Sequence, residues 1–156
     1  ARRIAAEGHS IGHHTWTHFD LSHMPEKDAF REIEQGIAAV ELAQHGIATT
    51  TPTTPFFRFP GFLTTPATLD LLRSRGIVVF GADFWANDWD HLTPTAELRL
   101  LTWRLRTARK GIILLHDTQP ATVAILPALL RYLGDNHYRV VHVVPTGPAV
   151  DFGGVP

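Results

Sequence analysis

Two histidines four residues apart, His14 and His18, are the side chains in this sequence best spaced to share a metal ion. On an extended strand that spacing separates two residues by roughly 13 Å, because each residue advances the chain by about 3.3 Å. Zinc holds each imidazole nitrogen at about 2.0–2.1 Å, so the chain must turn between the two rings. We therefore predict a helical turn just past a strand end. Solvated or hydrogen-bonded loop histidines are the alternative explanation.

A second polar segment follows a short aromatic run at 56–59, which contains Arg58 and leads directly into Pro60 and Gly61. An arginine this close to a core strand is costly unless a carboxylate pairs with it. The Pro-Gly pair turns the backbone so that an amide can face a cleft. These features favour a functional segment, and a structural arginine that caps the strand is the alternative.

Acidic and indole side chains follow the apolar run at 77–80. Asp88 and Trp89 are adjacent, and Asp83 and Trp85 lie just before them in what we predict to be a loop. A carboxylate beside an indole suggests a polar group next to a wall on which a sugar ring can stack. A core tryptophan with a capping aspartate is the alternative.

The apolar run at 112–115 ends in His116, so a predicted strand delivers one histidine to its carboxyl end. In parallel α/β folds this end of the strands is the functional edge. A structural histidine is the alternative. Ten histidines occur in all, and we expect supporting or structural roles for His9 and His13.

The composition limits the possible ligands and partners. There is no cysteine, so a transition metal must bind to His, Asp or Glu. The 14 basic and 15 acidic residues give a net charge of −1, which provides no broad field for nucleic acid or an anionic membrane. No apolar run approaches the roughly 20 residues that span a bilayer. A neutral substrate is therefore compatible with this chain.

The elements that position these residues alternate between helices and strands. The first residues are typical of a helix end closed by Gly8, as though the chain began inside an element. Helices are predicted at 25–44, 66–75, 94–109 and 121–134. Strands are predicted at 56–59, 77–80, 112–115 and 139–143, and continuous apolar runs indicate strands covered on both faces. The order βαβαβαβ favours a parallel sheet or barrel, with function at the carboxyl ends of its strands.

Taken in order, the four polar segments resemble those of the polysaccharide deacetylase (NodB-like) family, whose domain is a distorted (β/α) barrel. The resemblance runs from His9 to Val143, nearly the whole chain. It implies an α/β domain at 1–146 that lacks the family's first βα unit. The remaining residues, 147–156, are expected to form a flexible tail.

The resemblance also implies roles for the first two segments. His14 and His18 would bind Zn²⁺ or another divalent cation such as Co²⁺. Arg58 would orient a catalytic carboxylate, and the backbone amide at Gly61 would belong to an oxyanion hole.

The last two segments receive roles in the same way. Asp88 would orient the catalytic histidine, and Trp89 would wall the substrate groove. Leu114 would pack on the acetyl methyl group, and His116 would act as the general acid.

The implied activity is metal-assisted hydrolysis of N-acetyl groups on a chitin-like or peptidoglycan glycan, in the cell envelope or outside the cell. The implied partner is this N-acetylated glycan, with no nucleic acid and no membrane span. A deacetylase or amidase acting on a small non-sugar amide is one alternative. A non-catalytic carbohydrate-binding pseudoenzyme is another.

The sequence departs from the family pattern in three places. Phe19 follows the second metal histidine where proline is usual, and Gly61 stands where tyrosine is frequent. No Asp-Asp pair occurs in the sequence, although the family's first segment uses such a pair as catalytic base and metal ligand. We therefore expect the chain alone to be inactive. Three residues are candidates to replace the missing ligand: His9, His13 and Asp20.

Overall fold

The computed structural model describes residues 1–146, so the tail predicted at 147–156 lies outside the described residues. The chain divides into two compact units. Of the described residues, the first unit comprises 1–80 and 142–146, and the second unit comprises 81–141. Each unit has its own parallel strand pair and its own hydrophobic core.

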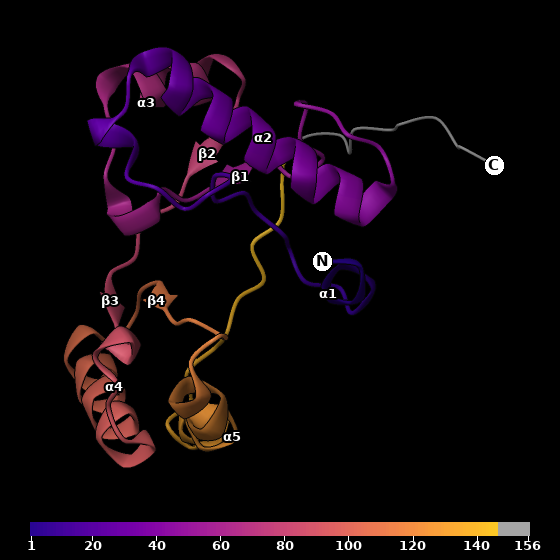
Figure 1. The fold of residues 1–156 in the computed structure, drawn as a ribbon. Coiled ribbons are helices and arrows are strands. Elements are labelled where there is room, and N and C mark those ends of the chain that lie inside the picture. Colours follow the sequence, from indigo (N-terminus) through magenta and orange to yellow (C-terminus); the bar gives the residue numbers. More distant parts are fainter. Residues whose placement is uncertain (147–156) are drawn as a thin grey trace. The chain divides into compact units, whose positions relative to one another are not determined.

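The first unit is built around β1 (Phe56–Phe57) and β2 (Val78–Val79), which pair in parallel (Figure 1). On the opposite edge of β1, His13 forms an isolated parallel bridge with Phe57. The backbone of the histidine segment is therefore hydrogen-bonded to β1. This arrangement confirms the predicted parallel pairing of neighbouring strands.

Three helices accompany these strands: α1 (Arg2–Ala6), α2 (Glu26–His45) and α3 (Pro66–Ser74). As predicted, Gly8 follows the first helix in the left-handed region, with φ of 84°. Gly46 ends α2 in the same way, with φ of 76°. Glycine suits both positions because it has no Cβ to clash in this conformation.

Two of the four predicted helix starts are confirmed and two are shifted by one residue; the helix predicted from 121 begins at Pro120. Thr65 and Thr68 form a reciprocal capping box, in which each side-chain oxygen accepts a hydrogen bond from the other residue's backbone N–H at 3.2 and 3.0 Å. Thr93 caps the next helix by accepting a hydrogen bond from the Ala96 N–H at 3.3 Å. Pro25, the predicted first residue of α2, instead occupies its cap position, and the helix begins one residue later at Glu26.

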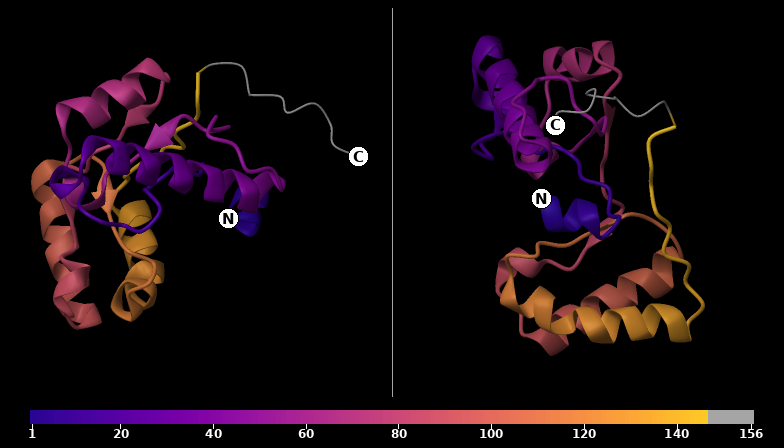
Figure 2. Two further views of the ribbon diagram at one scale, coloured as in Figure 1. Left: turned by 45° about the horizontal axis from the view of Figure 1, so that its top comes forward. Right: turned by 90° about the vertical axis from the view of Figure 1, so that its right-hand side faces the viewer.

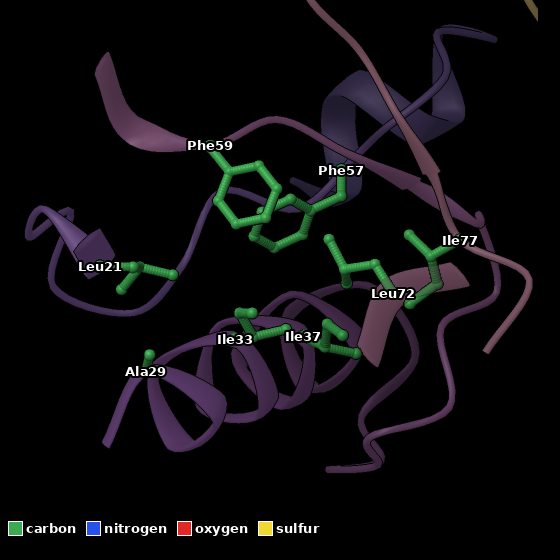
Figure 3. Packing of buried hydrophobic residues seen from close by; sticks show 8 residues of the cluster. All are labelled: Leu21, Ala29, Ile33, Ile37, Phe57, Phe59, Leu72 and Ile77. Atoms are coloured by element: carbon green, nitrogen blue, oxygen red, sulfur yellow. The ribbon is translucent and has the colours of Figure 1, made fainter. Parts of the chain in front are cut away.

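The core of the first unit lies between α2 and the strand β1 (Figure 3). Ile33 and Ile37 of α2 point toward Phe57 and Phe59, and Leu72 of α3 lies beside them. All five side chains are at most 2% exposed. Burying side chains of this size contributes about 1.5–3 kcal/mol each, so this cluster anchors the strand that precedes the Pro60–Gly61 turn.

The second unit repeats the strand–helix order: β3 (Phe84–Trp85), α4 (Pro94–Ala108), β4 (Ile113–Leu114) and α5 (Pro120–Asp135). The two strands pair in parallel. The two helices lie side by side in every view (Figures 1 and 2). A one-turn 3₁₀ helix, Asp88–Asp90, follows β3.

Three sequence predictions about the strands are wrong. Trp85 lies in β3, not in a loop, because its short strand finds a partner in β4. The strand predicted at 139–143 does not form, and Val140 is 72% exposed. Apolar residues alone do not make a strand when no neighbouring backbone pairs with them. The strand β2 is not covered on both faces, since Val78 is 51% exposed.

Among the helices of residues 1–146, none combines the length and the hydrophobicity needed to cross a membrane.

Candidate active site

The segment between His14 and His18 is an irregular turn, so the predicted helical conformation is wrong. Thr15 and His18 have positive φ values of 64° and 62°. The Thr15 hydroxyl oxygen accepts a hydrogen bond from the His18 backbone N–H at 3.2 Å, which closes the turn. The two imidazole rings nevertheless meet edge to face, with their centroids 4.8 Å apart. The turn therefore brings both rings together on the exposed side of the segment.

A backbone contact sets the orientation of the His14 ring. Its Nδ1 lies 2.7 Å from the carbonyl oxygen of Arg58. A carbonyl only accepts hydrogen bonds, so Nδ1 carries the proton and the lone pair of the neutral ring is on Nε2. Metal-binding histidines are commonly oriented in this way. The two adjacent, exposed rings thus fit two positions of a divalent-cation site.

Helix α2 supports this turn through two residues that the sequence analysis did not single out. The Glu32 carboxylate accepts a hydrogen bond from the Thr17 backbone N–H at 2.8 Å. Gly36 lies so close to Thr15 that a Cβ there would be 2.5 Å from the Thr15 carbonyl. The sequence signal that could have indicated such a close approach is an isolated glycine inside an amphipathic helix.

Arg58 and Gly61 lie where the sequence predicts, at the end of β1 and in the turn that follows. The Arg58 backbone N–H donates to the carbonyl of His13 at 3.0 Å, which continues the parallel bridge. Burial lowers the pKa of the Arg58 guanidinium from its ordinary value. Gly61 is exposed and has φ of 56°, a conformation that favours glycine. Their roles toward a carboxylate and an oxyanion stay predictions.

In the second unit, Asp88 and His116 form a direct pair. One carboxylate oxygen of Asp88 accepts from the His116 ring Nδ1 at 2.9 Å. The other accepts from the His116 backbone N–H at 2.6 Å. The Asp88 side chain is fully buried, whereas the His116 side chain is 39% exposed. The aspartate thus fixes the ring with Nδ1 protonated and leaves Nε2 as the site of proton exchange.

Two opposing effects act on the Asp88 carboxyl. Burial by itself raises the pKa of Asp88. Hydrogen bonds from the ring and backbone of His116 and from Thr122 lower the pKa by more than burial raises it. The net result is a pKa below the ordinary value. Asp88 is therefore the anionic partner of His116.

The carboxylate of Asp88 also belongs to a buried network. The Thr122 hydroxyl lies 3.1 Å from Asp88 Oδ2 and 2.8 Å from Glu97 Oε1. Burial raises the pKa of Glu97, and the nearby charge of Asp88 acts in the same direction. Neither Glu97 nor Thr122 was predicted as a site residue, because an acidic residue in a first helical turn ordinarily indicates a favourable helix-dipole interaction.

Trp89 and Leu114, the predicted substrate-binding residues, lie near this pair. Trp89 is 42% exposed, and its ring meets the His116 ring edge to face at 5.9 Å. Its centroid lies 6.0 Å from that of Trp85. Leu114 is half-buried and stands beside Trp85 in the strand register. The second unit thus presents an exposed indole next to an oriented imidazole.

The three residues considered as a third metal ligand are not gathered around His14 and His18. His13 is buried, and its Nε2 lies 3.2 Å from the Thr54 carbonyl and 3.8 Å from Glu41. Asp20 accepts hydrogen bonds from Ser22 and pairs with His23 at 2.6 Å. Over residues 1–146, no group of three or more His, Asp or Glu side chains is arranged to hold a metal.

Comparison with known proteins gives a consistent result. The family model for polysaccharide deacetylase matches residues 1–80, just over half of the 156 residues. A chitin deacetylase of Pestalotiopsis sp is 31% identical over 125 residues, covering 80% of this chain and 40% of the relative. Chitin deacetylase 2 of Saccharomyces cerevisiae is 27% identical over 150 residues, covering 92% and 46%. The chain thus spans less than half the length of these relatives.

Solved structures agree on the fold. A peptidoglycan deacetylase of Bdellovibrio bacteriovorus is similar with a TM-score of 0.80 and 28% identity, over 94% of this chain and 40% of that one. The chitin deacetylase of the fungal pathogen Colletotrichum lindemuthianum gives a TM-score of 0.74 at 23% identity, over 90% and 62%. The predicted fold class, part of a NodB-type (β/α) barrel, is confirmed. This chain belongs to the polysaccharide deacetylase family.

Proposed function

We propose that this chain contributes to a metal-dependent hydrolase that removes N-acetyl groups from an amino-sugar polymer or oligosaccharide, such as a chitin-like or peptidoglycan glycan. Membership of the family supports hydrolysis of the acetamide. The named chitin and peptidoglycan deacetylases among its relatives support a glycan substrate. On the same basis we propose that the protein acts in the cell envelope or outside the cell.

The observation that carries this proposal is the pair formed by Asp88 and His116. A buried carboxylate holds the protonated Nδ1 of an exposed ring at 2.9 Å. This is the arrangement by which a carboxylate orients an imidazole for proton transfer through its other nitrogen. We assign His116 as the general acid that protonates the leaving amine while the C–N bond breaks.

We assign His14 and His18 as ligands of Zn²⁺ or a similar divalent cation such as Co²⁺. When bound, this ion supplies Lewis-acid polarisation of the acetamide carbonyl. Arg58 orients a catalytic carboxylate, and the Gly61 amide donates a hydrogen bond to the developing oxyanion.

We assign Trp89 and Leu114 as residues that contact the substrate. The exposed Trp89 indole offers a flat apolar face for a sugar ring. Leu114 contacts the acetyl methyl group.

The test is acetate release by the full-length zinc-loaded protein from acetylated chitooligosaccharides, peptidoglycan and a simple amide. We expect His116→Ala to lose roughly 10²–10⁴-fold in turnover while keeping its metal and melting temperature. His137→Ala, which removes another exposed histidine of the second unit, is the matched control and keeps full turnover. Near-normal turnover of His116→Ala would remove this residue from the mechanism.

One observation favours a second candidate, a deacetylase of smaller amides. Gly61 has no side chain at a position where tyrosine is frequent in the family. The substrate groove therefore lacks the wall that a tyrosine ring would provide. Faster hydrolysis of the simple amide than of either glycan would support this candidate. Glycan binding without acetate release in the full-length protein would instead indicate a carbohydrate-binding module.

A further inference from the structure

We propose that Glu97 is a neutral carboxylic acid that holds Asp88 in place through the hydroxyl of Thr122, and that it thereby acts as a positioning residue for His116. The contacts run from Glu97 in the first turn of α4 to Thr122 in the first turn of α5. They continue to Asp88 in the 3₁₀ helix and end at His116, two residues after β4. The positioning role of Glu97 rests on the proposed function of His116 as general acid. The inference that Glu97 is protonated does not depend on that proposed function.

The contacts of Thr122 require one more proton than two ionised carboxylates and a hydroxyl provide. Thr122 Oγ1 lies 2.8 Å from Glu97 Oε1 and 3.1 Å from Asp88 Oδ2, both hydrogen-bonding distances. A hydroxyl has one proton, and an ionised carboxylate only accepts. With both carboxylates ionised, one of the two contacts would therefore bring two oxygens together without a proton. A proton on Glu97 Oε1 makes both contacts hydrogen bonds, Glu97 to Thr122 and Thr122 to Asp88.

The surroundings of the two carboxyl groups determine which of them carries the proton. Asp88 accepts three hydrogen bonds, two from His116 and one from Thr122. Glu97 is 0% exposed, and its Oε2 has no hydrogen-bond partner within the described part of the chain. Ionising Glu97 would leave charge on a buried oxygen without a donor, whereas a neutral acid leaves only a carbonyl oxygen there. The proton therefore belongs to Glu97, in agreement with the direction in which burial moves its pKa.

The network also fixes the carboxylate that holds His116. Asp88 Oδ2 receives the His116 backbone N–H and the Thr122 hydroxyl, so the carboxylate is held from two sides. Its other oxygen then faces the His116 Nδ1. A neutral Glu97 supplies this support without placing a second negative charge beside the pair. An ionised Glu97 would repel Asp88 and withdraw the proton that Thr122 donates to it.

The first experiment tests protonation. Infrared difference spectra of the full-length protein against Glu97→Gln at neutral pH should show the carbonyl stretching band of a protonated carboxylic acid, present only in the wild type. Glu97→Gln is isosteric and retains a donor for Thr122, so it is expected to fold. If the variant loses a carboxylate band and no carboxylic-acid band, Glu97 is ionised and the proposal is overturned.

The second experiment tests positioning. The downfield proton signal of the His116 Nδ1–H in NMR reports the hydrogen bond to Asp88. We expect Glu97→Gln and Thr122→Ser to keep this signal and to turn over at a rate within a few-fold of wild type. Thr122→Val, which removes the hydroxyl, should broaden or shift the signal and lower kcat on the order of tenfold with little change in KM.

The outcomes separate this inference from the proposed function. An unchanged signal and unchanged kcat in Thr122→Val would overturn the positioning role. A carboxylic-acid band from Glu97 together with near-normal turnover of His116→Ala would uphold the neutral Glu97, and it would overturn both the general-acid assignment and the positioning role that depends on it.

Discussion

Gly36 of α2 and the backbone of Thr15 are in such close contact that no side chain fits between them. A Cβ at Gly36 would lie 2.5 Å from the carbonyl carbon and oxygen of Thr15 and 2.8 Å from its Cα. The backbone of the turn that contains His14 and His18 therefore rests directly on the helix.

We predict that Gly36→Ala lowers the free energy of unfolding by about 1–3 kcal/mol, because the methyl group must push the Thr15 backbone away. Alanine is otherwise favoured over glycine in a helix by about 1 kcal/mol. Gly134→Ala in α5 is the control, since no atom lies within 4 Å of its added Cβ, and it should be neutral or stabilising. Urea unfolding midpoints measure both. Equal stability of Gly36→Ala and wild type would show that the turn is not held by this contact.

Glu32→Ala should destabilise the protein by about 1–3 kcal/mol, because the Thr17 N–H loses its buried acceptor at 2.8 Å. Glu32→Gln keeps a side-chain carbonyl in place and should lose less. Zinc affinity, measured by competition with a chelator, should fall in the same order. If both variants lose the same stability and affinity, the hydrogen bond is not what matters at this position.

His14→Ala and His18→Ala should each lose stoichiometric zinc, because each removes one of two adjacent rings with centroids 4.8 Å apart. Zinc should raise the melting temperature of the wild type but not of these variants, since a ligand stabilises only the state that binds it. Elemental analysis gives the metal content, with His137→Ala as the control. Retention of full metal content by both variants would contradict the assignment.

The stability of the protein should depend on pH through Glu97. Burial raises the folded-state pKa of Glu97 above its ordinary value of 4.5, so the folded state holds the proton over a pH window in which the unfolded state has released it. The proton on Glu97 contributes its full stabilisation of the folded state below pH 4.5. This stabilisation is lost as the pH rises toward the folded-state pKa. Glu97→Gln cannot lose a proton. Its stability relative to wild type should therefore increase with pH, by up to about 1.4 kcal/mol per unit within that window. A difference that is constant from pH 4 to 8 would contradict the raised pKa.

We predict that residues 1–156 alone release little acetate. The sequence contains no Asp-Asp pair, and catalytic zinc sites generally use three protein ligands plus water. The comparison is acetate release by this chain and by a protein in which an Asp-Asp strand precedes it, both loaded with zinc. Equal activity of the two would mean that the third ligand and the base lie within residues 1–156.

Local signals in the sequence predicted most of the fold. The Thr-Pro pairs at 65–66 and 93–94 and the glycine at 46 mark helix ends because capping depends on neighbours within one turn. The strand at 84–85 was not predicted, and the strand predicted at 139–143 does not form. Both errors have one cause. A two-residue strand exists only through the distant backbone that pairs with it, and no residue pattern contains that information.

The residue types and their spacing determined that His14 and His18 can meet and that His116 stands at a strand end. Only the tertiary structure decided that the turn at 15–18 is irregular, because it rests on Gly36, twenty-one residues away from Thr15. The same holds for Asp88, whose partners His116 and Thr122 are 28 and 34 residues distant. A side chain's protonation and orientation depend on burial and on donors brought in by other elements, and these arise only when the elements pack. Glu97 is one acidic residue among fifteen in the sequence, and its burial beside Thr122 makes it a neutral acid.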